Sequence, residues 1–302
     1  MPKSSRYTFI FNPAADKGRA ARKASWLRHS IAGIDDSALL TTGYAGHAGE
    51  LARVAALESD CLVACGGDGT LHEVVNAVAG RDIVVGVVPI GSANDFVKTI
   101  GRPGNVHESL TDCLGGAQRK VDLGSVVFNH DQRRFFVNSL GVGLTGRIAG
   151  KVKRHAWLKG ELGYVHALLS VLVGYTPLKM HIKITVPDGS VVEMHEPVFA
   201  FSVSNGKVEG SRFQIAPEAD PADGFLDVCI LKSIPKLMFF RYVLKYLRGS
   251  QILDPRVVYC KASEVEVFVP VSEFMHMDGE VFESLPGSIR ITAVPGALTV
   301  IS

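Results

Sequence analysis

Two continuous apolar runs, each followed directly by a glycine, constrain the fold of the first part of this chain most strongly. Cys61–Cys65 leads into Gly66, and Ile83–Ile90 leads into Gly91, with no alternation of apolar and polar residues in either run. A strand without alternation is buried on both faces, which is typical of a parallel sheet covered by helices. These runs therefore predict an α/β domain.

Helical stretches separate the predicted strands of this first part. Thr70–Ala79 places apolar residues at the i, i+3, i+4, i+7 spacing, and Gly46–Ser59 has a similar face. Shorter strands are predicted at Tyr7–Phe11 and Ala38–Thr42. We predict a nucleotide-binding α/β domain over residues 1–127, with ligands at the carboxyl ends of its parallel strands.

The pattern changes beyond about residue 122, where strand-like segments alternate with turn pairs such as Asp188-Gly189. This half predicts a mostly antiparallel, β-rich domain over residues 128–302, with the alternative that its last strand returns to the first domain. Two helical interruptions are expected, near 155–174 and 235–249. The predicted strands are Phe135–Leu140, Met180–Val186, Val191–Met194, Val198–Val203, Leu226–Leu231, Glu264–Val269 and Ile289–Val294.

Composition excludes several classes of protein. A length of 302 residues suffices for two domains, and a net charge of +2 from 32 basic and 30 acidic residues does not indicate nucleic-acid binding. Five cysteines without a CxxC pair indicate a reduced chain, so a cytoplasmic location is expected. The most apolar stretch, Tyr164–Leu178, is too short and too mixed to span a bilayer.

The sharpest motif is the loop Cys65-Gly66-Gly67-Asp68-Gly69-Thr70, between a strand and a helix. Its glycines let the backbone approach a phosphate chain, and the helix start adds unpaired N–H groups. An aspartate at such an anion site requires a cation between carboxylate and phosphate, and Mg²⁺ suits that position. Alternatively, Thr70 and Glu73 form a capping box that needs no ligand.

A second loop, Pro89–Phe96, repeats this arrangement after the next strand. Ser92 alternatively caps the short helix that follows, with Asp95 completing the box. The two loops lie at strand ends of one sheet, so together they predict a phosphate site. A formal GxGxxG over 141–146 lies outside any βαβ unit, and the P-loop pattern GxxxxGK[ST] is absent from the sequence.

Segments spread along the whole chain resemble the diacylglycerol kinase catalytic domain, a family that includes bacterial soluble lipid kinases and, more distantly, sphingosine kinases. The resemblance implies an α/β domain like that of NAD kinase and phosphofructokinase, followed by a β-sandwich. It also implies ATP- and Mg²⁺-dependent phosphorylation of diacylglycerol or a related long-chain lipid alcohol in phospholipid biosynthesis. The resembling segments are GGDGT with LHEVVNAV, PIGSANDF, Phe11-Asn12-Pro13 with Gly18, Thr42 with Gly46-His47-Ala48, Asn138 to Gly143, Ser204-Asn205-Gly206, Ile215-Ala216-Pro217, Asp223 to Asp227, and Asp278-Gly279-Glu280.

The resemblance also implies roles for individual residues. Asp278 is implied as the general base, although Asp278-Gly279 alone reads as a hairpin turn, and Asp68 is implied to act through Mg²⁺ and the γ-phosphate. Two positions depart from the family pattern: Ser92 replaces a threonine, and the segment from Glu209 to Ser211 replaces a glycine run. The implied ATP-site residues are Asn12, Thr42, Gly66, Gly67, Asp68, Gly69, Thr70, Glu73, Ser92 and Asn94.

A structural Mg²⁺ site is implied in the second domain, and a link between the two domains near the nucleotide is expected at Asp122. Asp223 is implied to hold the metal with groups at Asp220 and Phe225, partly through backbone oxygens, and Asp122 to connect the two domains. The alternative for the first of these segments is an ordinary turn.

A membrane-docking surface is expected if the acceptor is a lipid. Arg241, Lys245 and Arg248 follow one face of a helix, and a core helix with a solvated face is the alternative. The expected partners are ATP and lipid at the membrane surface, with no nucleic acid, and a homodimer is compatible with the sequence. A second basic cluster consists of Lys151, Lys153, Arg154, Trp157 and Lys159.

Two other functions fit parts of the pattern. An NAD-kinase-like enzyme shares the GGDGT loop and the two-domain plan, but would act on a soluble acceptor. A non-catalytic protein that binds nucleotide and lipid is the second alternative, and the intact Asp68 and Asp278 disfavour it.

Overall fold

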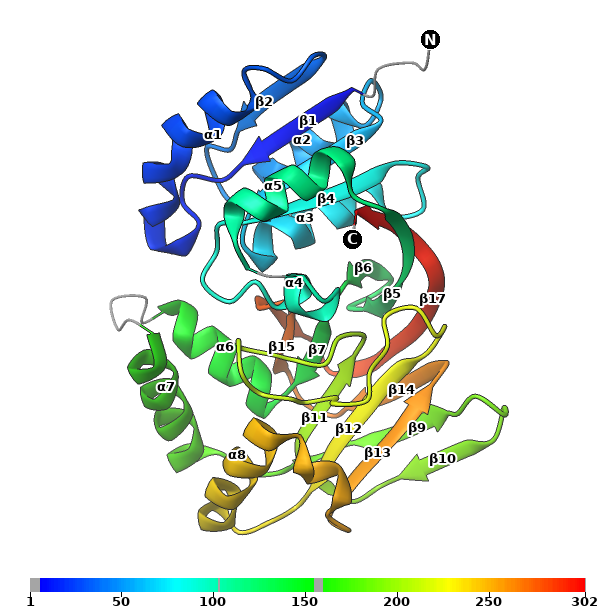
Figure 1. Cartoon of the computed structure of the whole chain (residues 1–302). Helices are drawn as coiled ribbons and strands as arrows, with labels where there is room; N and C mark the ends of the chain where they lie inside the picture. The colour runs from blue at the N-terminus through cyan, green and yellow to red at the C-terminus, as the bar shows by residue number, and fades with distance from the viewer. Residues whose placement is uncertain (1–5, 103, 155–159, 302) are drawn as a thin grey trace. The chain divides into compact units, whose positions relative to one another are not determined.

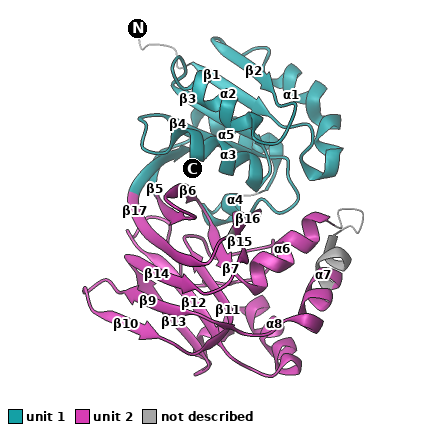
Figure 2. Cartoon of the chain, turned by 180° about the vertical axis from the view of Figure 1, so that it is seen from behind, with its two compact units in different colours: residues 1–121, 296–302 teal, residues 122–295 magenta. Residues whose placement is uncertain are grey.

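The computed structural model of the chain describes residues 6–102, 104–154 and 160–301, which fall into two compact units (Figure 1). Unit 1 comprises residues 1–121 and 296–302, and unit 2 comprises residues 122–295 (Figure 2). Two long strands, β5 (Gln118–Phe128) and β17 (Gly287–Ile301), each have residues in both units. The sequence-based boundary after residue 127 falls inside β5.

Unit 1 is built on a buried parallel sheet with the strand order β17-β4-β3-β1-β2. Every residue of β3 is buried, as expected for a strand without alternation. Besides β17, the strands are β1 (Tyr7–Phe11), β2 (Ser37–Thr41), β3 (Cys61–Gly66) and β4 (Val84–Pro89).

Helices cover both faces of this sheet. Phe9 and Phe11 pack with α1 and α5, whereas Ile10, on the opposite face of β1, is equally buried on the side of α2 and α3. The helical elements are η1 (Asp16–Lys23), α1 (Ala24–Ile31), α2 (His47–Ala55), α3 (Asp68–Val78), α4 (Asp95–Thr99) and α5 (Val106–Gly115).

Unit 2 is a β-sandwich. One sheet has the order β10-β9-β14-β17, with β5 and β6 joined to it through β17, and the other has the order β13-β12-β11-β7-β15-β16, with β8 beside β11. Ile182, Val265, Val203 and Met275 are among the residues that meet between the sheets. The strands are β6 (Gln132–Phe136), β7 (Ser139–Val142), β8 (Leu178–Lys179), β9 (His181–Thr185), β10 (Val191–Met194), β11 (Pro197–Ser204), β12 (Leu226–Lys232), β13 (Val257–Ala262), β14 (Glu264–Val269), β15 (Glu273–Met277) and β16 (Glu280–Ser284).

Three helices pack against the outer face of the second sheet of unit 2. They are α6 (Leu144–Arg154), α7 (Gly160–Gly174) and α8 (Phe239–Arg248), and the 3₁₀ turns η2 (Lys236–Met238) and η3 (Ser250–Leu253) flank α8. Their buried side chains share one cluster with Phe199 of β11 and Leu231 of β12. The predicted fold class is therefore confirmed: an α/β domain followed by a β-rich domain.

The prediction of one strand over Phe135–Leu140 is wrong, because the chain breaks there into β6 and β7. The intervening Val137 and Asn138 donate their amides to a buried carboxylate instead of to a neighbouring strand. The helix predicted near 155–174 is α7, although residues 155–159 lie outside the described part of the chain. The helix predicted near 235–249 is η2 with α8, which ends at the left-handed Gly249.

Helix α6 approaches β15 so closely that a glycine is required at the contact. A Cβ on Gly146 would lie 2.2 Å from the Phe274 carbonyl oxygen, whereas a Cβ on Gly150 meets nothing nearer than 3.7 Å. We expect Gly146→Ala to lower the free energy of unfolding by about 1–3 kcal/mol through overpacking. Urea denaturation measures this change.

Gly150→Ala, on the same helix, is the matched control. It should leave stability unchanged or raise it by up to about 1 kcal/mol, since alanine favours helix over glycine. Equal effects of the two substitutions would contradict the close approach of α6 to β15.

Candidate active site

The first predicted phosphate loop lies between β3 and α3. A Cβ on Gly66 would lie 2.3 Å from Thr70 Oγ1, so only glycine fits there. Asn12 Nδ2 donates to the same Thr70 oxygen at 3.0 Å, and the Asn12 backbone N–H donates to the Cys65 carbonyl at 3.0 Å. The end of β1 is therefore fixed to the GGDGT loop.

The second loop, after β4, touches the first through its backbone. A Cβ on Gly91 would lie 2.3 Å from Gly67 Cα, and the Gly91 N–H donates to the Gly66 carbonyl at 3.0 Å. Asn94 adopts a left-handed conformation with φ of 51°, and its Oδ1 accepts from the Gly91 N–H at 3.1 Å. The strand-end geometry thus brings the two loops together, as the parallel sheet predicts.

Asp68 connects these loops. Its Oδ1 accepts from the amides of Asp95 at 2.7 Å and Phe96 at 3.4 Å, at the start of α4. This contact gives Asp68 a structural role, and its role toward Mg²⁺ stays a prediction.

The capping box predicted for Thr70 and Glu73 is wrong. Helix α3 begins at Asp68, so Thr70 lies inside the helix, and no side chain caps the N-cap residue Gly67. Glu73 instead accepts from the amides of Gly46 at 2.7 Å and Ala48 at 3.0 Å, at the start of α2.

Ser92 and Thr42 complete the predicted ATP-site residues. Ser92 does not cap α4, whose N-cap is Asn94, and its hydroxyl donates to Asp16 Oδ1 at 2.6 Å. Thr42 is buried after the end of β2, and its N–H donates to the Phe11 carbonyl at 2.9 Å. All the predicted ATP-site residues lie in unit 1; most lie at strand ends or helix starts, and Glu73 lies in the middle of α3.

Asp278 lies in unit 2, in a two-residue turn between β15 and β16. Asp278 and Gly279 have φ of 50° and 82°, so the hairpin-turn alternative is correct for the backbone. The Asp278 side chain, however, is buried and accepts three backbone amides: Val137 at 3.0 Å, Asn138 at 2.8 Å and Ser139 at 3.2 Å. An ordinary turn needs no such anchoring of its carboxylate.

Beside Asp278, the half-buried Glu209 and the buried His276 form an ion pair, with Oε1 and Nε2 3.2 Å apart. Burial raises the pKa of Glu209, but the charge of His276 outweighs it and holds that pKa below its usual value. Burial lowers the pKa of His276, and Glu209 outweighs it in turn, so that the His276 pKa is raised. Each group therefore favours the charged form of the other.

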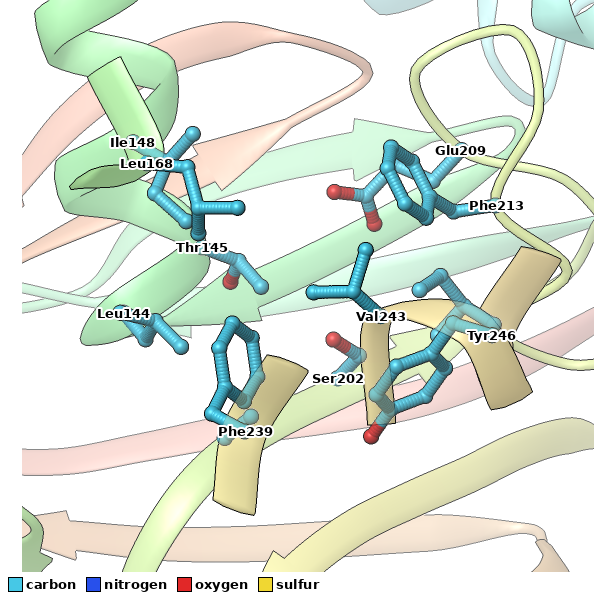
Figure 3. Close-up of a pocket in the computed structure, with 12 residues that line it drawn as sticks. Leu144, Thr145, Ile148, Leu168, Ser202, Glu209, Phe213, Phe239, Val243 and Tyr246 are labelled. Atoms are coloured by element: carbon cyan, nitrogen blue, oxygen red, sulfur yellow. The ribbon is translucent and has the colours of Figure 1, made fainter. Parts of the chain in front are cut away.

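An apolar pocket opens beside this pair, entirely within unit 2 (Figure 3). Its empty space is about 540 Å³, including the part open to solvent. Helices α6, α7 and α8 and strand β11 line it, and the Glu209 carboxylate points into it from the loop after β11. The apolar lining includes Leu144, Ile148, Leu168, Phe213, Phe239 and Val243.

Residues 6–126 match the diacylglycerol kinase catalytic domain, and residues 138–302 match the YegS C-terminal NAD kinase beta sandwich-like domain. A diacylglycerol kinase of Bacillus subtilis is 31% identical over 292 residues, which are 93% of this chain and 92% of that protein. This chain belongs to the diacylglycerol kinase family. The resemblance found in the sequence is confirmed, and the protein is an enzyme of the diacylglycerol kinase type.

Further relatives agree with this family. A diacylglycerol kinase of Mycobacterium tuberculosis is 25% identical over 301 residues, covering 98% of this chain and 94% of that protein. A crystal structure from Bacillus anthracis, of a protein provisionally described as a diacylglycerol kinase, has a TM-score of 0.79 and 25% identity. It covers 100% of this chain and 96% of its own.

The implied metal loop of this kinase holds its carboxylates with other partners. Asp223 pairs with the Lys261 ammonium and accepts from the Phe225 N–H at 3.0 Å. Asp220 accepts from the Ala222 N–H at 3.1 Å. Oxygen donors suit Mg²⁺, but the metal would have to compete with Lys261, so this site stays a prediction.

Asp122 is buried and accepts from the Gly224 N–H at 2.7 Å. That bond fixes Asp122 to the 220–225 loop inside unit 2. Its implied role between the domains stays a prediction.

Sequence reasoning missed Asp16 and the Glu209–His276 pair. Asp16 accepts from Ser92, and the following Lys17 and Gly18 have positive φ. Glu209 carried a signal, because it stands where the family has a glycine run. His276 carried none, since one histidine in an alternating strand is an ordinary residue.

The Glu209–His276 pair predicts a window in the pH dependence of stability. Because the Glu209 pKa is lower in the folded protein, Glu209 stabilises the fold at pH values above the ordinary glutamate pKa. That contribution is lost as the pH falls through the pKa of the folded state. Because the His276 pKa is higher in the folded protein, His276 stabilises the fold at pH values below the ordinary histidine pKa. That contribution is lost as the pH rises through the pKa of the folded state. The stability difference between the parent and Glu209→Gln should therefore peak at about pH 5–6.

Urea unfolding at several pH values measures this difference. Glu218→Gln, which changes an exposed carboxylate on the same loop, is the control and should give a flat difference. A flat profile for Glu209→Gln as well would mean that the pair is not ionised.

Proposed function

We propose that this enzyme transfers the γ-phosphoryl group of Mg·ATP to a hydroxyl of diacylglycerol or a related long-chain lipid alcohol. The observation that carries this proposal is the apolar pocket of unit 2, which ends on polar groups beside Asp278. An acyl chain suits such a lining, whereas a soluble dinucleotide acceptor does not. The family and the names of its relatives support the same acceptor.

The two glycine loops of unit 1 supply the donor side of the reaction. Backbone N–H groups of Gly66–Thr70, with Asn12, Ser92 and Asn94, would bind the phosphates. Mg²⁺, when bound, would neutralise phosphate charge next to Asp68. On the acceptor side, Asp278 would take the hydroxyl proton as the new O–P bond forms and the bond to the ADP oxygen breaks.

One incubation separates this proposal from its alternatives. The protein is incubated with labelled ATP, Mg²⁺ and, in turn, dioctanoylglycerol, NAD and water. We expect label on the lipid alone. Label on NAD would favour the NAD-kinase-like function, and no transfer to any acceptor would favour the non-catalytic one.

Asp278→Asn tests the general base. We expect turnover to fall by about 10²–10⁴-fold with little change in the KM for ATP. The asparagine amide would face a backbone N–H, so stability should also fall by about 1–3 kcal/mol. Asp188→Asn, in another Asp-Gly turn of unit 2, is the matched control and should be neutral. Near-normal turnover of folded Asp278→Asn would exclude Asp278 as the base.

Asp68→Asn tests the role of Asp68 toward Mg²⁺ separately from its structural role. Asparagine keeps an acceptor for the Asp95 and Phe96 amides and loses only the charge. We expect an unchanged melting temperature and a marked loss of Mg·ATP turnover. Normal use of Mg·ATP would show that Asp68 acts only as a link between the loops.

We also propose that the outer face of α8 docks on anionic membrane. No helix in the described part of the chain is long and apolar enough to cross a bilayer. Phe240 and Leu244 are exposed on α8 beside Arg241 and Arg248, and Leu237 just before the helix is 82% exposed. Lys245 differs from its expected role, because it pairs with Asp254 at 2.6 Å.

In the second basic cluster, Lys153 pairs with Glu280 at 2.7 Å. Trp157 and Lys159 lie outside the described residues.

Reversing Arg241 and Arg248 to glutamate should weaken binding to anionic vesicles by about 10- to 100-fold. Salt should weaken binding of the parent in the same direction. Co-sedimentation measures both, and the exposed pair Arg133 and Arg134 on β6, reversed together, provides a charge-matched control. Equal binding of the two double variants would overturn docking through α8.

A further inference from the structure

The polar end of the unit 2 pocket contains side-chain atoms without hydrogen-bond partners. Glu209 Oε2 and Thr145 Oγ1 are both buried and both lack a partner, and the two residues line the same pocket. Buried polar groups are nearly always hydrogen-bonded, because an unpaired one loses its bonds to water without replacement. These atoms therefore indicate a ligand that brings hydrogen bonds with it.

A glycine and a hydrogen bond allow these side chains to lie close together. A Cβ on Gly141 would lie 2.1 Å from Thr145 Oγ1 and 2.7 Å from His276 Nε2, so the glycine leaves room for both. Asn138 Nδ2 donates to the Val208 carbonyl at 2.7 Å and so holds the segment that carries Glu209. The formal GxGxxG pattern over 141–146 thus has a role in packing.

A purely structural role for the ion pair would leave these observations unexplained. Such a pair could hold the loop after β11 against β15 without facing a cavity. Glu209, however, engages His276 through Oε1 and keeps Oε2 unpaired, with its carboxylate directed into the pocket (Figure 3). A free carboxylate oxygen at the end of an apolar pocket fits a hydroxyl donor.

We propose that Glu209 and His276 form the subsite that recognises the polar end of an uncharged acceptor lipid. Glu209 Oε2 accepts a hydrogen bond from a lipid hydroxyl, and the Thr145 hydroxyl bonds a neighbouring lipid oxygen. His276 positions Glu209 and offsets its charge, so that the subsite does not favour an ammonium group. This subsite rests on the proposed lipid kinase function and adds a selection between neutral and amine-bearing alcohols.

The charges nearby set the direction of that selection. Two carboxylates, those of Glu209 and Asp278, act on His276, and its positive charge offsets one of them. Replacing His276 with neutral glutamine leaves both carboxylates uncompensated, which favours a cationic acceptor. Replacing Glu209 with glutamine removes the negative charge and makes the side chain a weaker hydrogen-bond acceptor for the lipid hydroxyl.

The test compares Glu209→Gln, His276→Gln and the control Glu218→Gln on two short-chain acceptors, dioctanoylglycerol and an amine-bearing sphingoid base. Glu209→Gln should raise the KM for dioctanoylglycerol by about 10- to 100-fold, because a hydrogen bond to a charged group is lost, with a smaller change in kcat. His276→Gln should raise the ratio of kcat/KM for the amine to that for the neutral lipid by about tenfold. Glu218→Gln should leave both values unchanged.

An unchanged KM in Glu209→Gln, or an unchanged acceptor ratio in His276→Gln, would overturn the subsite. If either variant fails to fold, Thr145→Val keeps the proposal testable, since it preserves shape and removes one unpaired hydroxyl. It should raise the same KM severalfold, and an unchanged KM would again contradict the proposal.

A parent enzyme inactive on every lipid would overturn the proposed function instead. Calorimetric binding of dioctanoylglycerol then tests the subsite alone. Weaker binding by Glu209→Gln than by Glu218→Gln would support it, and equal binding would exclude it.

Discussion

The buried carboxylate of Asp278 organises the centre of unit 2. It takes three consecutive backbone amides, from Val137 to Ser139, and these bonds separate β6 from β7. The backbone amide of Asn138 bonds to Asp278, and its side-chain amide donates to the carbonyl of Val208, next to Glu209. Glu209 pairs with His276, two residues before Asp278. This closed set of contacts gives the proposed base, the loop and the pocket a common anchor.

In both units, glycine lets backbone segments approach more closely than a side chain would allow. The proposed phosphate site needs exposed backbone amides, and the proposed lipid pocket needs closely packed walls. In unit 1, Gly67 and Gly91 let two loops touch where a Cβ on Gly91 could not fit, which places their amides at one edge of the sheet. In unit 2, Gly141 and Gly146 let α6 approach β7 and β15 and hold Thr145 beside His276. The first pair belongs to the loops of the proposed phosphate site, and the second pair shapes a pocket. A glycine pattern therefore indicates that something lies close to the backbone, and the surrounding fold determines whether it is a ligand or another element of the chain.

Much of the fold was predictable from the sequence, because periodicity reports burial directly. The continuous runs at Cys61–Cys65 and Ile83–Ile90 gave buried parallel strands, and the turn pairs located most of the β-rich half. Partners distant in sequence were not predictable. Glu73 has the spacing of a capping box, yet it reaches Gly46 and Ala48 on another helix. Likewise, Glu209 and His276 are far apart in the chain, and no local pattern connects them.

In the proposed function, the two faces of helix α8 would serve different purposes, one lining the lipid pocket and the other docking on the membrane. Phe239, Val243 and Tyr246 line the pocket, whereas Phe240, Leu244 and Arg241 lie on the exposed side. Lys245 is held by Asp254, whose pKa falls to about 2 through that bond and its neighbours, so this ion pair fastens the helix on its sandwich at neutral pH. Under the proposed docking, Arg241 and Arg248 would meet anionic headgroups. An acyl chain leaving the bilayer beneath α8 would then need to pass only the thickness of one helix to reach the pocket, about 10–12 Å.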